Sequence, residues 1–308
     1  GILPAKGKDN RKMFTLNCKG KLLETREPVV MGVINVTPDS FYEGSRFIQT
    51  TIAGAEKAGI DAIVRKAGQM IGDGAGIIDI GAQSSRPGAQ LLSADEELFR
   101  LKGVFEALTR HFPDTPFSID SFYSRVASEA AAAGASIIND ISGGSMDDQM
   151  LATAGKSGLP YICMHMRGTP QTMQQLTGYE NVTLEVLDYF IAKTEVCRLA
   201  GIRDIIIDPG FGFSKNNEQN FELLKNMPAL QVLDKPILAG LSRKSMVYKT
   251  LGVSPEQALN GTTAVNMLAL MHGANILRAH DVREARECIA LYREWRDAGI
   301  CRKDSPGK

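Results

Sequence analysis

Eight short apolar runs, most of them ending at a polar residue or glycine, alternate along this chain with longer segments of helical composition. Short, continuously apolar strands are buried on both faces, which requires a parallel sheet with helical crossovers. Eight such units within 308 residues predict an α/β fold of the (β/α)8 TIM-barrel type. The runs are Val29–Asn35, Ile77–Gly81, Pro116–Asp120, Ser136–Asp140, Pro160–Met164, Asp204–Asp208, Pro236–Gly240 and Asn275–Arg278.

The segments between these runs have helical spacing, as in Thr183–Leu199 and Pro255–Met271. In the second segment, one helical face is predicted to hold Ala258, Leu259, Thr262, Val265, Leu268 and Ala269. The alternative architecture is a doubly wound open sheet, which is less favoured because no G-x-G-x-x-G follows the first strand.

Ahead of the first run, Phe14–Leu23 predicts a β-hairpin that turns near Lys19–Gly20 and closes the bottom of the barrel. We therefore divide the chain into a tail and hairpin (1–28), a barrel (29–300) and a C-terminal tail (301–308).

The charge balance argues against binding to nucleic acid or to a membrane surface. The chain has 35 Lys+Arg and 35 Asp+Glu, whereas proteins that hold such polyanions are usually basic. Five scattered cysteines without a C-x-x-C pair are typical of free thiols in a reducing compartment. With no secretory signal and no apolar run of membrane-spanning length, we expect a cytoplasmic protein.

Polar residues follow most of the predicted strands. In a barrel enzyme the carboxyl ends of the strands form the active-site mouth, so these side chains converge. Asn and Asp at single strand ends are often only turn formers, but a whole set is hard to explain in that way. Carboxylate and amide side chains can hydrogen-bond a flat, nitrogen-rich heterocycle. The basic side chains of Lys244, Arg278 and His280 can hold an anion. The set is Asn35, Asp120, Asn139, Asp140, Met164, His165, Asp208, Gly240, Lys244, Arg278 and His280.

Each of these residues also has a structural interpretation. Lys244 is a candidate Schiff-base lysine, a hydrogen-bond donor or an exposed side chain. Asp140 is a strong candidate for a structural, hydrogen-bonded carboxylate, and Asp120 is a weaker one. His165 lies at a strand end without an identifiable partner. Because H-E-x-x-H, C-x-x-C, G-x-S-x-G and Walker motifs are all missing from the sequence, a metal is expected only as Mg²⁺ held mainly by a diphosphate.

Seven short motifs occur in order between residues 31 and 283, and together they resemble the dihydropteroate synthase family. They read NVTPDSF, SSRPGA, IDS, INDISGG, DPGFGF, SRKS and RAHDV. Each motif is weak alone, whereas seven in register are specific. The resemblance implies a (β/α)8 transferase of folate biosynthesis, usually homodimeric and a target of sulfonamides. It would join a dihydropterin diphosphate to p-aminobenzoate and release pyrophosphate.

The resemblance also assigns residues. The pterin would be held by Asp120, Asn139, Met164, Asp208, Gly240 and Lys244. The diphosphate would be held by Asn35, Arg278 and His280, with Mg²⁺ contacting Asn35. The p-aminobenzoate pocket would comprise Ser84, Ser85, Arg86, Pro87, Phe213 and Ser245. Catalytic roles would fall to Asp120, Lys244, Asp39 and Glu43.

The chain departs from the family pattern at a few positions. The resemblance implies two lids over the site, Val36–Phe47 and Ala82–Leu92. Ser85 replaces a common Thr, Gln83 a common Glu and Ala279 a common Val, while Glu43 replaces the usual Asp of the first lid. The implied reaction has diphosphate depart before the amine attacks, so it needs no enzyme nucleophile. Three alternatives remain at this stage: a pterin-binding methyltransferase, a Schiff-base aldolase that uses Lys244, and a barrel retained as a scaffold.

Overall fold

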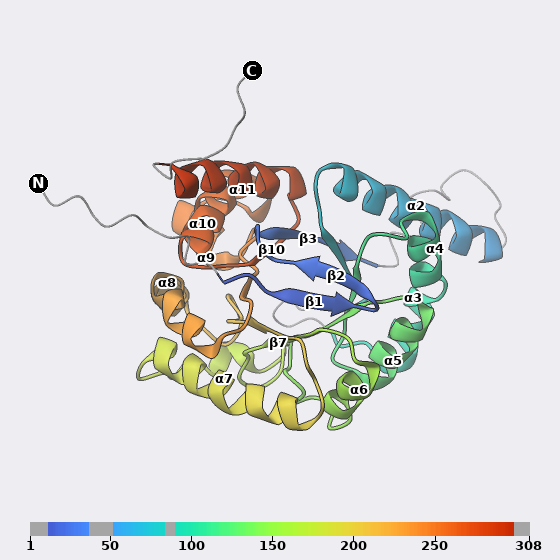
Figure 1. The fold of residues 1–308 in the computed structure, drawn as a ribbon, viewed down its shortest axis with the longest axis horizontal. Helices are drawn as coiled ribbons and strands as arrows, with labels where there is room; N and C mark the ends of the chain where they lie inside the picture. The colour runs from blue at the N-terminus through green and yellow to red at the C-terminus, as the bar shows by residue number, and fades with distance from the viewer. Residues whose placement is uncertain (1–11, 37–51, 84–89, 299–308) are drawn as a thin grey trace, which may run out of the picture.

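The computed structural model describes residues 12–36, 52–83 and 90–298, and these form the predicted barrel (Figure 1). Eight parallel strands lie in the order β8-β7-β6-β5-β4-β3-β10-β9. Ile207 of β8 forms a parallel bridge with Ile237, directly before β9, and this bridge closes the barrel. The strands are β3 (Val29–Asn35), β4 (Ile77–Gly81), β5 (Phe117–Asp120), β6 (Ile137–Asp140), β7 (Tyr161–Met164), β8 (Ile205–Asp208), β9 (Leu238–Ala239) and β10 (Ile276–Ala279).

Helices surround these strands in Figure 1. The α-helices are α2 (Ile52–Gly72), α3 (Ala94–Leu101), α4 (Val104–His111), α5 (Ser124–Ala133), α6 (Met150–Ser157), α7 (Val182–Leu199), α8 (Asn217–Asn226), α9 (Ser245–Leu251), α10 (Leu259–Met271) and α11 (Val282–Asp297). Short 3₁₀ segments are η1 (Met173–Gln175), η2 (Met227–Leu233) and η3 (Pro255–Gln257). None of the helices in the described ranges is long and apolar enough to cross a membrane.

The closed barrel confirms the predicted fold class and excludes the open sheet. Most of the observed strands lie within one residue of the predicted bounds, and two segments differ by more. The run Pro236–Gly240 contains only the two-residue strand β9, partly because proline has no N–H for a sheet ladder. The predicted helix at Pro255 begins instead at Leu259, because Ser254 caps the separate turn η3. On the predicted face of that helix Thr262, Val265 and Ala269 are buried, whereas Leu268 is 42% exposed.

The N-terminal hairpin closes the bottom of the barrel, as predicted. Strands β1 (Thr15–Cys18) and β2 (Lys21–Glu24) pair antiparallel around a turn with positive φ at Lys19 and Gly20. Leu16 and Cys18 pack in one apolar cluster with a ring of strand residues. That bottom layer comprises Met31, Ile77, Ile137, Ile162, Ile206, Leu238 and Ile276.

The bottom layer also explains where the polar residues lie. Side chains alternate across a strand, so a residue two positions further along points into the barrel as well. Counting two residues onward from the bottom layer therefore gives the next layer toward the mouth. That layer is Val33, Asp79, Asn139, Met164, Asp208, Gly240 and Arg278.

Candidate active site

A half-buried arginine, Arg278, bridges two carboxylates at the centre of the barrel. Arg278 Nε donates to Asp79 Oδ2 at 2.7 Å, and Arg278 Nη2 donates to Asp120 Oδ2 at 2.7 Å. Asn139 Nδ2 donates to the same Asp79 oxygen at 3.0 Å. Asp79 is completely buried, and its second oxygen has no hydrogen-bond partner among the described residues. The cluster therefore joins strands β4, β5, β6 and β10.

Two carboxylates of the site are held in surroundings that favour their neutral forms. Burial and the neighbouring charge of Asp79 raise the pKa of Asp120 to about 7, against the opposing effect of Arg278. Burial also raises the pKa of Asp208, whose Oδ1 accepts the Gly210 N–H at 2.8 Å. With a pKa of about 7, Asp120 can exchange a proton near neutral pH, as functional carboxylates often do.

Lys244 lies across the DPGFGF turn that follows β8. It precedes α9, and its Nζ donates to Phe211 O at 2.7 Å and lies 4.2 Å from the centre of the Phe213 ring. Gly212 has a φ of +80°, and a Cβ there would lie 3.0 Å from Lys244 Cδ. Burial lowers the pKa of Lys244 to about 8, although the carboxylate of Asp208 opposes that shift. The sequence-based alternative of a simply exposed lysine is therefore wrong.

His280 and Asn35 lie at the ends of their strands. His280 Nδ1 is 3.1 Å from Ser242 Oγ, and burial together with the Arg278 charge lowers the pKa of His280 to about 4. Asn35 is the exposed last residue of β3, in register with Gly81 of β4. Ser245, the first residue of α9, directly follows Lys244. Of the predicted anion-binding residues, Asn35 and His280 thus lie at the ends of their strands, whereas Arg278 belongs to the central cluster.

An apolar cluster lies on the β5 to β8 side of the site. Met164 and Phe213, both predicted site residues, belong to it. The other buried members are Phe122, Ile141, Met166 and Met173. Aromatic and thioether side chains of this kind suit the flat faces of conjugated rings.

Six predicted residues lie outside the described residues, so their roles stay predictions. They are Asp39, Glu43, Ser84, Ser85, Arg86 and Pro87. Gln83, one of the departures from the family pattern, is described. Its amide accepts from Leu92 N at 3.0 Å and donates to Leu92 O at 2.8 Å and to Glu97 Oε1 at 2.9 Å. An amide can donate to the buried Glu97, whereas an ionised glutamate at position 83 could not.

The structural interpretation holds for Asp140. It accepts hydrogen bonds from Ser142 N, Ser142 Oγ, Gly144 N and Tyr161 Oη, each at 2.7 Å. Arg243 is structural too, because its guanidinium forms two 2.8 Å bonds to Asp281 and bonds to the carbonyls of Pro255 and Glu256. It joins the SRKS motif to the start of α11.

Sequence reasoning missed two site residues. Asp79 interrupts an otherwise apolar strand, and a buried charge at an inward position was the available signal. Lys215 is the partner that could not be identified for His165, at 3.0 Å between Nζ and Nδ1. No spacing in the sequence predicts that contact, because β7 and the β8–α8 connection meet only in the folded barrel.

The fold and this site define a barrel enzyme for a nitrogen-rich, anionic substrate, and the family of pterin binding enzymes matches residues 31–280. Dihydropteroate synthase of Escherichia coli K12 is 42% identical over 278 residues, covering 90% of this chain and 94% of that protein. The Synechocystis enzyme is 42% identical over 271 residues, covering 87% and 90%.

Solved structures agree with this relationship. Xanthomonas albilineans dihydropteroate synthase with 4-aminobenzoic acid has a TM-score of 0.83 at 34% identity, covering 92% of this chain and 98% of that one. Yersinia pestis dihydropteroate synthase with a sulfonamide drug has a TM-score of 0.82 at 39% identity, covering 92% and 100%. The chain belongs to the dihydropteroate synthase family.

Proposed function

We propose that this chain condenses 6-hydroxymethyl-7,8-dihydropterin diphosphate with p-aminobenzoate to form 7,8-dihydropteroate and pyrophosphate. The observation that carries the proposal is the polar layer around Arg278. This layer lies at the carboxyl end of a barrel that belongs to the family of pterin binding enzymes. Relatives with solved structures bind 4-aminobenzoic acid and 7,8-dihydropteroate.

The inner residues suit the pterin ring. Asp120, Asp208 and Asn139 supply acceptors for its N–H groups, and Lys244 supplies a donor for its carbonyl. Met164 and Gly240, in the same layer, border the ring. A pterin carries donors and acceptors along one edge, so this mixture of carboxylates, amide and ammonium complements it.

Three residues toward the carboxyl ends of the strands suit the leaving group. Asn35, Arg278 and His280 would hold the diphosphate, and charge-assisted hydrogen bonds from Arg278 would stabilise its charge as it departs. Among the described residues no cluster of three or more His, Cys, Asp or Glu side chains could hold a metal ion. Mg²⁺ would therefore be bound mainly by the diphosphate with Asn35, where it would neutralise charge on the leaving oxygens.

The chemistry then needs positioning and electrostatics rather than a nucleophile. The bond between the pterin methylene and the diphosphate oxygen breaks, and its electron pair leaves with the diphosphate. The carboxylate of Asp120 stabilises the positive charge on the methylene and ring. The nitrogen of p-aminobenzoate then forms the new C–N bond and loses a proton. Ser245 and Phe213 would contribute to the p-aminobenzoate pocket.

Two alternatives are less well supported. A Schiff-base aldolase fits the lowered pKa of Lys244, but it has no use for the carboxylates around Arg278. A methyltransferase of the same barrel type would use the same pterin-binding residues, but it needs no diphosphate site at Arg278 and His280. The curated relatives reported above are dihydropteroate synthases.

The test is to incubate the chain with dihydropterin diphosphate, p-aminobenzoate and Mg²⁺ and to quantify dihydropteroate and pyrophosphate. Equimolar release of both products is expected, with a strong loss in Asp120→Asn. The matched control is Asp95→Asn, which alters an exposed aspartate on α3. Absence of both products from the folded wild-type chain would refute the proposal.

We also propose that the chain forms a homodimer through α10 and α11, which pack against each other. Large apolar side chains are exposed on both helices, and a group of this kind is typical of an interface. They are Leu268, Met271, Leu291 and Trp295. Sedimentation velocity should show a dimer that Leu291→Glu disrupts and Phe99→Glu, on the distant helix α3 in Figure 1, does not. A monomeric wild-type chain would refute this surface.

A further inference from the structure

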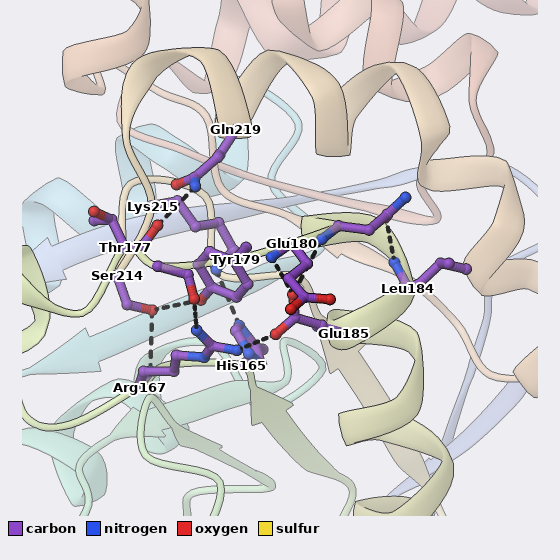
Figure 2. A network of polar contacts seen from close by, with 12 residues as sticks. His165, Arg167, Thr177, Tyr179, Glu180, Leu184, Glu185, Ser214, Lys215 and Gln219 are labelled. Atoms are coloured by element: carbon purple, nitrogen blue, oxygen red, sulfur yellow. Dashed lines mark hydrogen bonds and ion pairs between the residues drawn. The ribbon is translucent and has the colours of Figure 1, made fainter.

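A second buried lysine, Lys215, lies behind the DPGFGF turn. It is 4% exposed and directly precedes Asn216, the N-cap of α8. Its Nζ lies 3.0 Å from each of three acceptors: His165 Nδ1, Gly210 O and Phe213 O. Figure 2 shows Lys215 and His165 as members of a network of polar contacts. Three acceptors match the three hydrogens of an ammonium group.

The histidine of this group is a fixed acceptor. Burial, assisted by the charges of Lys215 and Arg167, lowers the pKa of His165 to about 2, so its ring is neutral at physiological pH. The ring packs edge-on against Tyr189, with centroids 4.9 Å apart. Neutral His165 therefore offers the lone pair of Nδ1 to Lys215 from a packed position.

The two carbonyls determine the shape of the turn. Gly210 O and Phe213 O bracket the segment whose Phe211 O accepts from Lys244 Nζ and whose Phe213 ring lies beneath that ammonium. The turn also approaches β7 closely, because a Cβ on Gly210 would lie 2.0 Å from His165 O. Whatever holds these carbonyls therefore also sets the position of Lys244.

Ser214, the residue directly after the turn, makes contacts with a second group of residues (Figure 2). Ser214, with a φ of +47°, accepts the Arg167 N–H at 3.0 Å. The Arg167 guanidinium stacks 3.7 Å from the centre of the Tyr179 ring and pairs with Glu185. These contacts attach Ser214 to the barrel without involving Lys215.

Burial makes the charged form of Lys215 unfavourable. Burial lowers the pKa of Lys215 to about 7, and among the described charged groups that face it only Asp208 opposes the shift, while Lys244 and Arg167 reinforce it. Buried groups with perturbed protonation concentrate at functional sites.

We propose that Lys215 is a positioning residue, whose three hydrogen bonds hold the DPGFGF turn so that Lys244 is correctly placed for the pterin. This inference rests on the proposed function. A displacement of about 1 Å from a productive geometry can reduce a rate by about 10²-fold. Loss of the donors at position 215 should therefore reduce activity mainly through the pterin, with a smaller effect on p-aminobenzoate, because Lys215 also bonds to the carbonyl of Phe213.

The experiment compares Lys215→Met with Lys225→Met, the same change at an exposed lysine at the end of α8. Lys215→Met should lower kcat/KM for dihydropterin diphosphate by about 10²-fold while leaving KM for p-aminobenzoate within a few fold. Lys215→Arg, which keeps the charge and the donors, should recover most of the loss. The affinity of Lys215→Met for 6-hydroxymethylpterin should fall together with kcat/KM. Calorimetry measures this affinity, with the protein concentration taken as that of folded protein.

The outcomes separate the two proposals. If the wild-type chain forms no dihydropteroate, the proposed function fails, and pterin calorimetry still tests the role of Lys215. The inference is overturned if Lys215→Met matches Lys225→Met in pterin affinity and kcat/KM. It is also overturned if Lys215→Arg is as defective as Lys215→Met. Should Lys215→Met fail to fold, Lys215→Gln, which keeps two donor hydrogens, replaces it and should show a smaller loss with the same preference for the pterin.

Discussion

Asp79 offers the sharpest test of the electrostatics of the site, because one of its oxygens accepts from both Arg278 and Asn139. Asp79→Asn keeps the shape of the side chain and removes its charge. Arg278 would keep its bond to Asp120 but lose its second carboxylate. The amide nitrogen introduced by the substitution would face either Arg278 or the position where Asp79 Oδ1 has no partner among the described residues.

The magnitude follows from the type of bond that is lost. Hydrogen bonds to charged groups contribute about 1.5–3 kcal/mol each, so the free energy of unfolding should fall by about that amount. Urea denaturation at pH 8 measures the loss. Asp95→Asn is the matched control, because Asp95 also accepts a 2.7 Å bond from an arginine, but at the surface. Exposed pairs of this kind contribute only about 0–1 kcal/mol.

The same variant should change the pH dependence of catalysis. The negative charge of Asp79 helps to raise the pKa of Asp120 to about 7, so its removal should lower that pKa. If catalysis requires ionised Asp120, kcat/KM for the pterin substrate rises with pH through about 7, and Asp79→Asn should move this limb to lower pH. The reasoning is refuted if stability falls no further than in Asp95→Asn and the acidic limb does not move.

Three more predictions concern ligand binding. Arg278→Ala and His280→Ala should weaken binding of dihydropterin diphosphate far more than binding of bare hydroxymethyl-dihydropterin; equal losses in calorimetry would contradict the diphosphate site. Lys244 should not form a Schiff base, so its mass should be unchanged after carbonyl compounds and borohydride, whereas a reduced adduct would revive the aldolase. Sulfonamides should compete with p-aminobenzoate and bind more tightly with Mg²⁺ and pyrophosphate present, because only a fraction of the empty protein is expected to be competent; an identical dissociation constant in both conditions would show no such coupling.

The barrel was predictable from sequence because each strand is a short apolar run that ends in a recognisable turn. Val29–Asn35 and Ile77–Gly81 match β3 and β4 at both ends. The hairpin was predictable from the Lys19–Gly20 turn. The exposure of Leu268 could not be predicted, because helical spacing identifies an apolar face without showing how far the neighbouring helices cover it.

The site was only partly predictable. Asp120, Asn139, Asp208 and Lys244 follow from motifs, and the barrel brings them to one mouth. Arg278 was assigned with His280 to the anion, yet its guanidinium reaches inward to bridge two carboxylates, a direction that no motif encodes. Lys215 could not be predicted, because its acceptors come from two different strand connections. Such contacts depend on three-dimensional packing rather than on local sequence.

The hairpin at the bottom has a consequence for the order of events. Because Leu16 and Cys18 pack across one end of the barrel, ligands must enter from the carboxyl ends of its strands. A ligand that occupies the deepest layer must then arrive before any ligand that binds nearer the rim. The deeper ligand must also leave after the ligand at the rim has left. In the proposed reaction the pterin takes the inner position, so the kinetics should be ordered: dihydropterin diphosphate enters first, and p-aminobenzoate second.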